Sequence, residues 1–169
     1  MRTKKIKNKS NDMLEERKEY LRWKRKNVTL RGIRQFGKSN EAGSHLGRGL
    51  YTASLSNRSL AKQYGKVYFV VNAIPKKPKI VDRLNEAEVF IQKLIRGFCN
   101  KNSIEYRDFE KYSSIEKEML KLGYDGIIIR GNFMVNYKPP KNVKYFRTEK
   151  ELYEYYKKYV KKKLKRKEQ

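Results

Sequence analysis

Runs of apolar residues divide the chain into short strands and amphipathic helices. The longest run, over 66–74, is continuous, which is typical of a strand buried on both faces. Shorter β-branched or alternating runs predict strands at 28–31, 50–53, 80–81, 126–130, 133–138 and 143–146. Apolar residues at helical spacing predict helices over 11–26, 58–64, 84–100 and 115–122, and from 149 into the C-terminal tail. Since strands and helices do not alternate strictly, the pattern indicates an α+β fold.

Capping residues mark the starts of three of these helices. Ser113-x-x-Glu116 and Thr148-x-x-Glu151 each have the spacing of a capping box. Asn57 stands where the helix over 58–64 needs an N-cap.

Charge is distributed very unevenly along the 169 residues. The net charge is +25, from 43 Lys and Arg against 18 Asp and Glu, and the cations concentrate within 1–9 and 157–167. Like charges at this density repel, so we expect both ends to fray without a counter-ion. The expected organisation is a basic tail and charged helix over 1–27, a domain over 28–147, and a helix with a basic tail over 148–169.

The positive charge has two interpretations. It suits a polyanionic partner, and tyrosines interleaved with lysines near the C-terminus offer faces on which nucleic-acid bases can stack. It also suits lysine-biased codon usage with solvated tails, and the helical spacing of Leu152, Tyr156 and Tyr159 indicates core packing instead. If the first interpretation holds, the two basic tails bind nucleic acid without sequence preference.

Several classes of site are excluded by composition. Cys99 is the only cysteine and His45 the only histidine, so an internal disulfide and a multi-cysteine or multi-histidine metal site are ruled out, and no metal is expected. The basic start is not followed by the apolar run of a secretory signal, and no window approaches a membrane span. We therefore expect a cytoplasmic protein.

The strongest chemical signal is the stretch 47–65, a glycine-flanked strand followed by a short helix. Gly47 and Gly49 precede Tyr51, whose ring offers a flat face. The hydroxyl and aromatic side chains of the stretch are Tyr51, Thr52, Ser54, Ser56, Ser59 and Tyr64. Upstream, a guanidinium at Arg31 can fork onto a phosphate, and Gly32 lets a flat amide approach the backbone. The alternative is a core strand with a packed tyrosine and an ordinary helix.

The stretch 47–65 resembles the NAD-binding segment of diphtheria-toxin-like and poly(ADP-ribose)-polymerase-like transferases. The segment 122–128, with the strand that follows it to a proline, resembles the closing half of the ADP-ribosyltransferase domains in bacteriophage polyvalent proteins. The resemblance covers about residues 28–147. It implies two small β-sheets around an NAD cleft, NAD as co-substrate, and transfer of one ADP-ribose to a host protein or nucleic acid. It also implies a phage-encoded protein that is located in the host cytoplasm or packaged in a virion.

The resemblance also implies roles for individual residues. Tyr51 would stack on nicotinamide and Gly32 would bond its carboxamide. The catalytic positions are Arg31, Tyr51 and Met134, and the NAD-binding positions are Arg31, Gly32, Gly49, Tyr51, Thr52, Ser54, Ser59 and Tyr64.

The third motif of that family is missing. Breaking the nicotinamide–ribose bond builds positive charge on the sugar, which a carboxylate stabilises. The family places a glutamate on the strand before the proline turn, but no acidic residue lies between Asp125 and Glu149 here. Two alternatives follow: a transferase that borrows a carboxylate from its acceptor, or a degenerate domain that acts as a basic nucleic-acid- or virion-binding protein.

Overall fold

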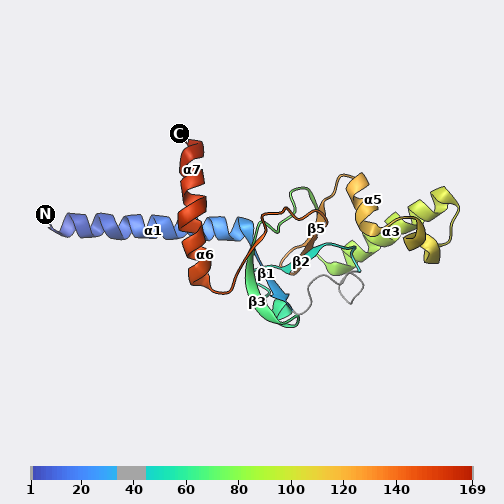
Figure 1. Cartoon of the computed structure of the whole chain (residues 1–169), viewed down its shortest axis with the longest axis horizontal. Helices are drawn as coiled ribbons and strands as arrows, with labels where there is room; N and C mark the ends of the chain where they lie inside the picture. The colour runs from blue at the N-terminus through green and yellow to red at the C-terminus, as the bar shows by residue number, and fades with distance from the viewer. Residues whose placement is uncertain (1, 34–44, 169) are drawn as a thin grey trace.

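A mixed β-sheet runs through the middle of the protein (Figure 1). The computed structural model describes residues 2–33 and 45–168. Within them seven strands lie in the order β4-β5-β6-β2-β1-β3-β7, antiparallel except for the parallel pair β4–β5. The strands are β1 (Val28–Ile33), β2 (Leu50–Ala53), β3 (Lys66–Val71), β4 (Pro78–Val81), β5 (Gly126–Ile129), β6 (Phe133–Asn136) and β7 (Lys144–Phe146).

The predicted α+β class is confirmed, whereas the expectation of two small sheets is wrong for the described residues. The strands form one sheet because β1 and β2 are hydrogen-bonded neighbours. Only the pair Leu30–Ala53 joins them, so a single residue pair connects β4-β5-β6-β2 to β1-β3-β7. The predicted loop over 34–48 lies mostly outside the described residues.

Helices cover the two ends of the sheet (Figure 1). At one end α3 and α5 pack against β5 and β6, and at the other end α1, α2 and α6 pack against β1 and β3. The helical elements are α1 (Arg2–Asn27), α2 (Arg58–Lys62), α3 (Leu84–Asn102), the 3₁₀ turn η1 (Tyr106–Asp108), α4 (Phe109–Tyr112), α5 (Ile115–Lys121), α6 (Glu149–Tyr155), the π-helical turn η2 (Tyr156–Val160) and α7 (Lys161–Glu168). The sequence pattern did not predict η1 and α4.

The capping residues are only partly as predicted. Thr148 caps α6, since its hydroxyl accepts a hydrogen bond from the amide of Glu151 at 3.2 Å. The cap of α5 is Ser114 rather than Ser113, because its hydroxyl accepts from the amide of Lys117. Asn57 stands at the N-cap position of α2, but it makes no side-chain cap bond.

The terminal helices differ most from expectation. The predicted frayed tails are instead helical, with α1 beginning at Arg2 and α7 ending at Glu168. The continuous helix of α6, η2 and α7 crosses α1 (Figure 1), and Tyr20 of α1 is buried against Tyr156 of η2, with ring centroids 5.3 Å apart. A helix anchored this way propagates at little further cost through lysine, a good helix former. Tyr20 and Tyr156 share a hydrophobic cluster with Leu30 of β1, so the terminal helices complete the core of the domain.

Candidate functional site

Strands β1 and β2 pair at one position and then separate, and this separation is the parting of the two strands. All six residues of β1 pair with β3, but only Leu30 pairs with β2, opposite Ala53. Beyond that pair the facing edges of the two strands, over 31–33 and 50–52, have no ladder pairing with each other.

The residues that face each other across this parting follow from strand alternation. The amide of Ser54 donates to the carbonyl of Asn132 at 3.0 Å, beside β6, so the backbone groups of Tyr51 point the other way, toward β1. Gly32 lies two residues beyond Leu30, which pairs with β2, so its N–H and C=O point toward β2. The backbones of Gly32 and Tyr51 therefore face each other.

The side chain of Tyr51 is held in place by contacts of its ring and of its hydroxyl. Its ring is half-buried and lies 6.3 Å, centroid to centroid, from the ring of Phe133 on β6. Its hydroxyl donates to the carbonyl oxygen of Gly47. Burial raises the pKa of Tyr51, and the nearby charge of Glu116 raises it further. The ring is therefore fixed as a neutral, flat surface.

The segment just before β2, residues 46–47, is held in place by two tyrosine side chains. Gly47 has φ +106°, and a Cβ there would lie 2.9 Å from the ring of Tyr137, so only glycine fits. Tyr137 is itself buried and donates to the carbonyl of Leu46 at 2.6 Å. Two tyrosine hydroxyls thus anchor two successive carbonyls.

Glu116 brings a carboxylate to this segment that the sequence did not reveal as a site residue. Its Oε2 accepts a hydrogen bond from the amide of Arg48 at 3.1 Å, and its charge contributes to the raised pKa values of Tyr51 and Tyr137. It lies 65 positions after Tyr51 in sequence, in the first turn of α5. The only sequence signal at Glu116 was the capping-box spacing, which points to helix capping.

Gly32 lies beside the parting and also allows close packing between β1 and α2. A Cβ at this position would lie 2.0 Å from the carbonyl oxygen of Ala61 on α2 and 2.9 Å from the backbone of Tyr64. The absence of a side chain lets α2 sit directly on β1 and brings Tyr64 beside Gly32. The side chain of Tyr64 is exposed.

Three predicted site residues lie on the face of the sheet opposite Tyr51. Arg31 donates to the hydroxyl of Tyr145 at 3.0 Å, so its guanidinium is engaged away from the parting. Thr52 is buried, and its hydroxyl has no hydrogen-bond partner among the described residues. Met134, opposite Thr52 in the register, is also buried. On β6 it is Phe133 and Val135, not Met134, that share the face of Tyr51.

The remaining predicted residues lie just outside β2 or on α2. A Cβ on Gly49 would lie 2.4 Å from the carbonyl oxygen of Asn136, so this glycine permits close approach to β6. Ser54 follows the other end of the strand, near Asn57, whose amide nitrogen donates to Asn132. Ser59 donates to Asn57 Oδ1 at 3.3 Å and is exposed. Ser54 and Ser59 thus belong to a separate polar group.

Two open hollows lie away from these residues. The larger, of about 490 Å³, lies between α3 and α5 and includes Lys93, Phe98 and Lys121. The smaller, of about 410 Å³, lies between β4 and α3. Neither is lined by Gly32, Tyr51 or Phe133.

No comparison assigns the chain to a family. Protein-family models, curated proteins and solved structures were all compared with it, and none matches. Within 2–33 and 45–168, no three His, Cys, Asp or Glu side chains are grouped so as to hold a metal ion. No helix over the same residues is long and apolar enough to cross a membrane.

Proposed function

We propose that the protein is an ADP-ribosyltransferase-like protein that binds NAD where β1 and β2 part. One observation carries the proposal: past the pair Leu30–Ala53, the backbones of Gly32 and Tyr51 face each other without ladder bonds. A carboxamide carries both a donor and an acceptor, so it matches the N–H and C=O of an unpaired strand edge. The adjacent ring of Tyr51 suits stacking on a flat heterocycle.

The residues present fit the nicotinamide end of NAD better than its pyrophosphate. Gly32 would bond the carboxamide and Tyr51 would orient the ring. Arg31 is engaged with Tyr145 on the opposite face, so we assign it no phosphate contact. When bound, NAD supplies the glycosidic bond whose cleavage releases nicotinamide.

Transfer by this site is expected to be slow. On the face of Tyr51, β6 presents Val135 directly opposite and Phe133 diagonally, and neither carries the carboxylate that would stabilise positive charge on a ribose. Glu116 carries a carboxylate near the hydroxyl of Tyr51 that could supply this negative charge. A carboxylate on the acceptor is a second possible source of the same charge. The acceptor classes that we propose are a host protein or nucleic acid.

The apolar ring of Phe133 also favours a second candidate function. A domain that retains the nicotinamide-binding elements but lacks the strand carboxylate would bind NAD without turning it over. Incubation of the protein with labelled NAD and cell lysate separates the two functions, because only a transferase labels an acceptor.

Isothermal titration calorimetry with NAD and with nicotinamide tests the proposal at millimolar ligand. Tyr51→Leu removes the ring and should weaken binding by about 1 kcal/mol, roughly fivefold. Tyr51→Phe retains the ring and should bind nearly as the wild type does. Tyr112→Leu, at an exposed tyrosine of α4, is the matched control. Absence of wild-type binding to either ligand would refute the proposal.

A further inference from the structure

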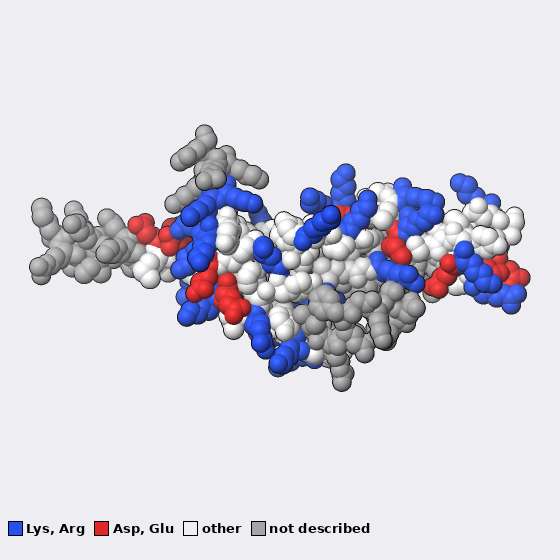
Figure 2. Space-filling view, viewed as in Figure 1, with Lys and Arg blue, Asp and Glu red and all other residues white. Residues whose placement is uncertain are grey.

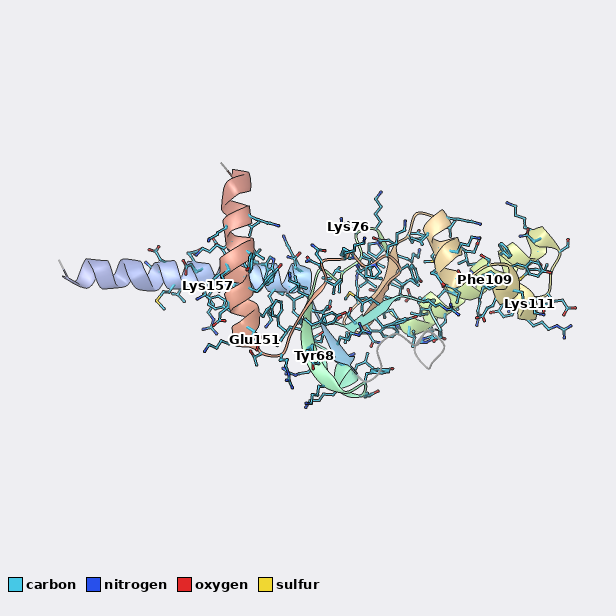
Figure 3. All side chains as sticks on the ribbon, in the orientation of Figure 1. Tyr68, Lys76, Phe109, Lys111, Glu151 and Lys157 are labelled. Carbon is cyan, nitrogen blue, oxygen red and sulfur yellow. The ribbon has the colours of Figure 1, made fainter. Side chains whose placement is uncertain are left out.

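The C-terminal helical rod, formed by α6, η2 and α7, changes its charge along its length. It begins with acidic residues and then carries eight Lys and Arg within 157–167, with no Asp or Glu among them. Figure 3 shows Glu151 near the start of the rod and Lys157 further along it. Figure 2 shows Lys and Arg side chains gathered along the rod, with acidic side chains at its α6 end.

Most of the described cations on the basic part of the rod are not neutralised within the protein. Lys161 is the exception, since it donates to Glu16 of α1 at 2.5 Å. Lys158, Lys162 and Lys163 are exposed, and no ion pair joins any of them to the described residues. Lys158 and Lys162 are four apart, a spacing at which like charges repel and destabilise a helix. A bound polyanion would relieve this repulsion.

An exposed aromatic ring lies among these lysines. Tyr159 is 60% exposed, and its ring centroid lies 5.5 Å from that of Tyr155. The Lys144 ammonium lies over the ring of Tyr155, 5.9 Å from its centroid. Lys162 and Lys163 follow Tyr159 by three and four residues, the spacing of neighbours on a helix surface. Of the two neighbouring tyrosines, Tyr155 thus has Lys144 at its ring, and Tyr159 is followed by two lysines within about one helical turn.

The helical turn that carries Tyr159 is anchored on α1. Tyr159 belongs to the π-helical turn η2, a rare element that is frequent at functional sites. Tyr156 of the same turn is buried, with its ring 5.1 Å from Trp23 and 5.3 Å from Tyr20 of α1. These contacts anchor the rod on α1, so the exposed side of the turn is presented from a fixed position.

We propose that a strip of lysines and tyrosines on and beside the rod binds single-stranded nucleic acid. Its members are Lys144, Tyr155, Tyr159, Lys162 and Lys163. A base would stack on Tyr159, and the lysines would neutralise the adjoining phosphates. A single strand is favoured over a duplex because a base must be unstacked to offer its face to a tyrosine. This activity is independent of the NAD site, since it uses none of its residues.

Fluorescence anisotropy with a labelled 20-nucleotide oligo-dT tests the proposal on the full chain. Tyr159→Ala should weaken binding about 5- to 150-fold, the range that corresponds to loss of one base–aromatic stack, and Tyr159→Phe should not. The double variant Lys162→Gln/Lys163→Gln should reduce the slope of log affinity against log salt by about 1.4, since each single-strand phosphate contact contributes about 0.7. The matched controls are Tyr106→Ala, at an exposed tyrosine on η1, and Lys93→Gln/Lys101→Gln on α3.

Three results would overturn the proposal. The first is a loss of affinity in the control variants equal to that in the strip variants, which would indicate a diffuse charge effect. The second is tighter binding to a duplex of the same length with no response to Tyr159→Ala. The third is no binding to oligo-dT but binding to vesicles of phosphatidylcholine and phosphatidylserine. Melting curves by circular dichroism establish that each variant is folded.

Discussion

Phe133 of β6 lies beside Tyr51 of β2, with ring centroids 6.3 Å and ring planes 33° apart. The register explains this pairing, because Phe133 stands opposite Ala53 and therefore shares the face of Tyr51. Met134, one residue later, points to the other face. The strand beside Tyr51 thus presents an aromatic ring and not the carboxylate that the proposed glycosidic chemistry would use.

We predict that Phe133→Glu raises NAD hydrolysis by at least about tenfold over the wild type, because a carboxylate beside Tyr51 would stabilise the charge that develops on the ribose. Met134→Glu is the matched control, since it places the same group on the buried opposite face. It should lower the melting temperature without raising activity. Nicotinamide release, followed by chromatography, is the measurement. A folded Phe133→Glu variant with unchanged activity would contradict the prediction.

Glu116→Gln should lower the residual hydrolysis of NAD by the wild-type protein, because Glu116 carries the described carboxylate whose charge acts on Tyr51. The amide oxygen of glutamine can still accept from Arg48, so folding should be retained. Glu110→Gln on α4 is the control, at an exposed glutamate. Equal rates for all three proteins would exclude Glu116 from the reaction.

Gly32→Ala should destabilise the fold by about 1–3 kcal/mol or more, because its Cβ would lie 2.0 Å from the carbonyl oxygen of Ala61 and would force α2 away from β1. Gly97→Ala provides the contrast. It lies in α3, where an added Cβ would have open space around it, and should stabilise the protein by about 0.5–1 kcal/mol. Urea unfolding measures both. Similar effects of the two substitutions would mean that α2 does not sit on Gly32.

Tyr137→Phe should lower the free energy of unfolding by about 1–2 kcal/mol at neutral pH, because it leaves the carbonyl of Leu46 without its hydroxyl donor. Burial raises the pKa of Tyr137 in the folded protein above the value of about 10 expected when unfolded.

This shift sets a pH dependence with a definite sign. Above about pH 10 the unfolded chain loses the Tyr137 proton while the folded protein retains it, so the stabilisation is complete below pH 10 and is lost as the pH rises. The difference in stability between wild type and Tyr137→Phe should therefore shrink by up to about 1.4 kcal/mol per pH unit. Urea unfolding between pH 8 and 11 measures it. A difference that stays constant over this range would contradict the assignment.

Much of the local structure was predictable because it depends on neighbouring residues. The continuous apolar run at 66–74 became β3, and the apolar helical spacing at 84–100 became α3. The N-cap at Thr148 formed as predicted because the amide that it accepts from, that of Glu151, is only three residues away. Asn57 shows the limit: its side chain donates to Asn132, 75 residues away, and local propensity carries no information on such a contact.

The placement of the candidate site residues was less predictable. Because side chains alternate along a strand, Arg31 and Gly32 must lie on opposite faces of the sheet. Which of the two lies on the face of Tyr51 depends on the pairing Leu30–Ala53. A shift of one residue in that register would have brought Arg31 to the face of Tyr51. Glu116 reaches the site only because α5 packs against the segment before β2, a contact that no local pattern encodes.

The sequence by itself determined the α+β class, the positions of most strands and helices, and the concentration of charge at the two ends, because each of these depends on side-chain periodicity or composition. Tertiary structure alone decided that the strands form one sheet joined by a single residue pair, that the basic ends are helices crossing on Tyr20 and Tyr156, and that Phe133 rather than Met134 borders Tyr51. The physical reason is that strand register and helix packing are set by contacts between residues far apart in the chain, whose energies depend on the whole buried core.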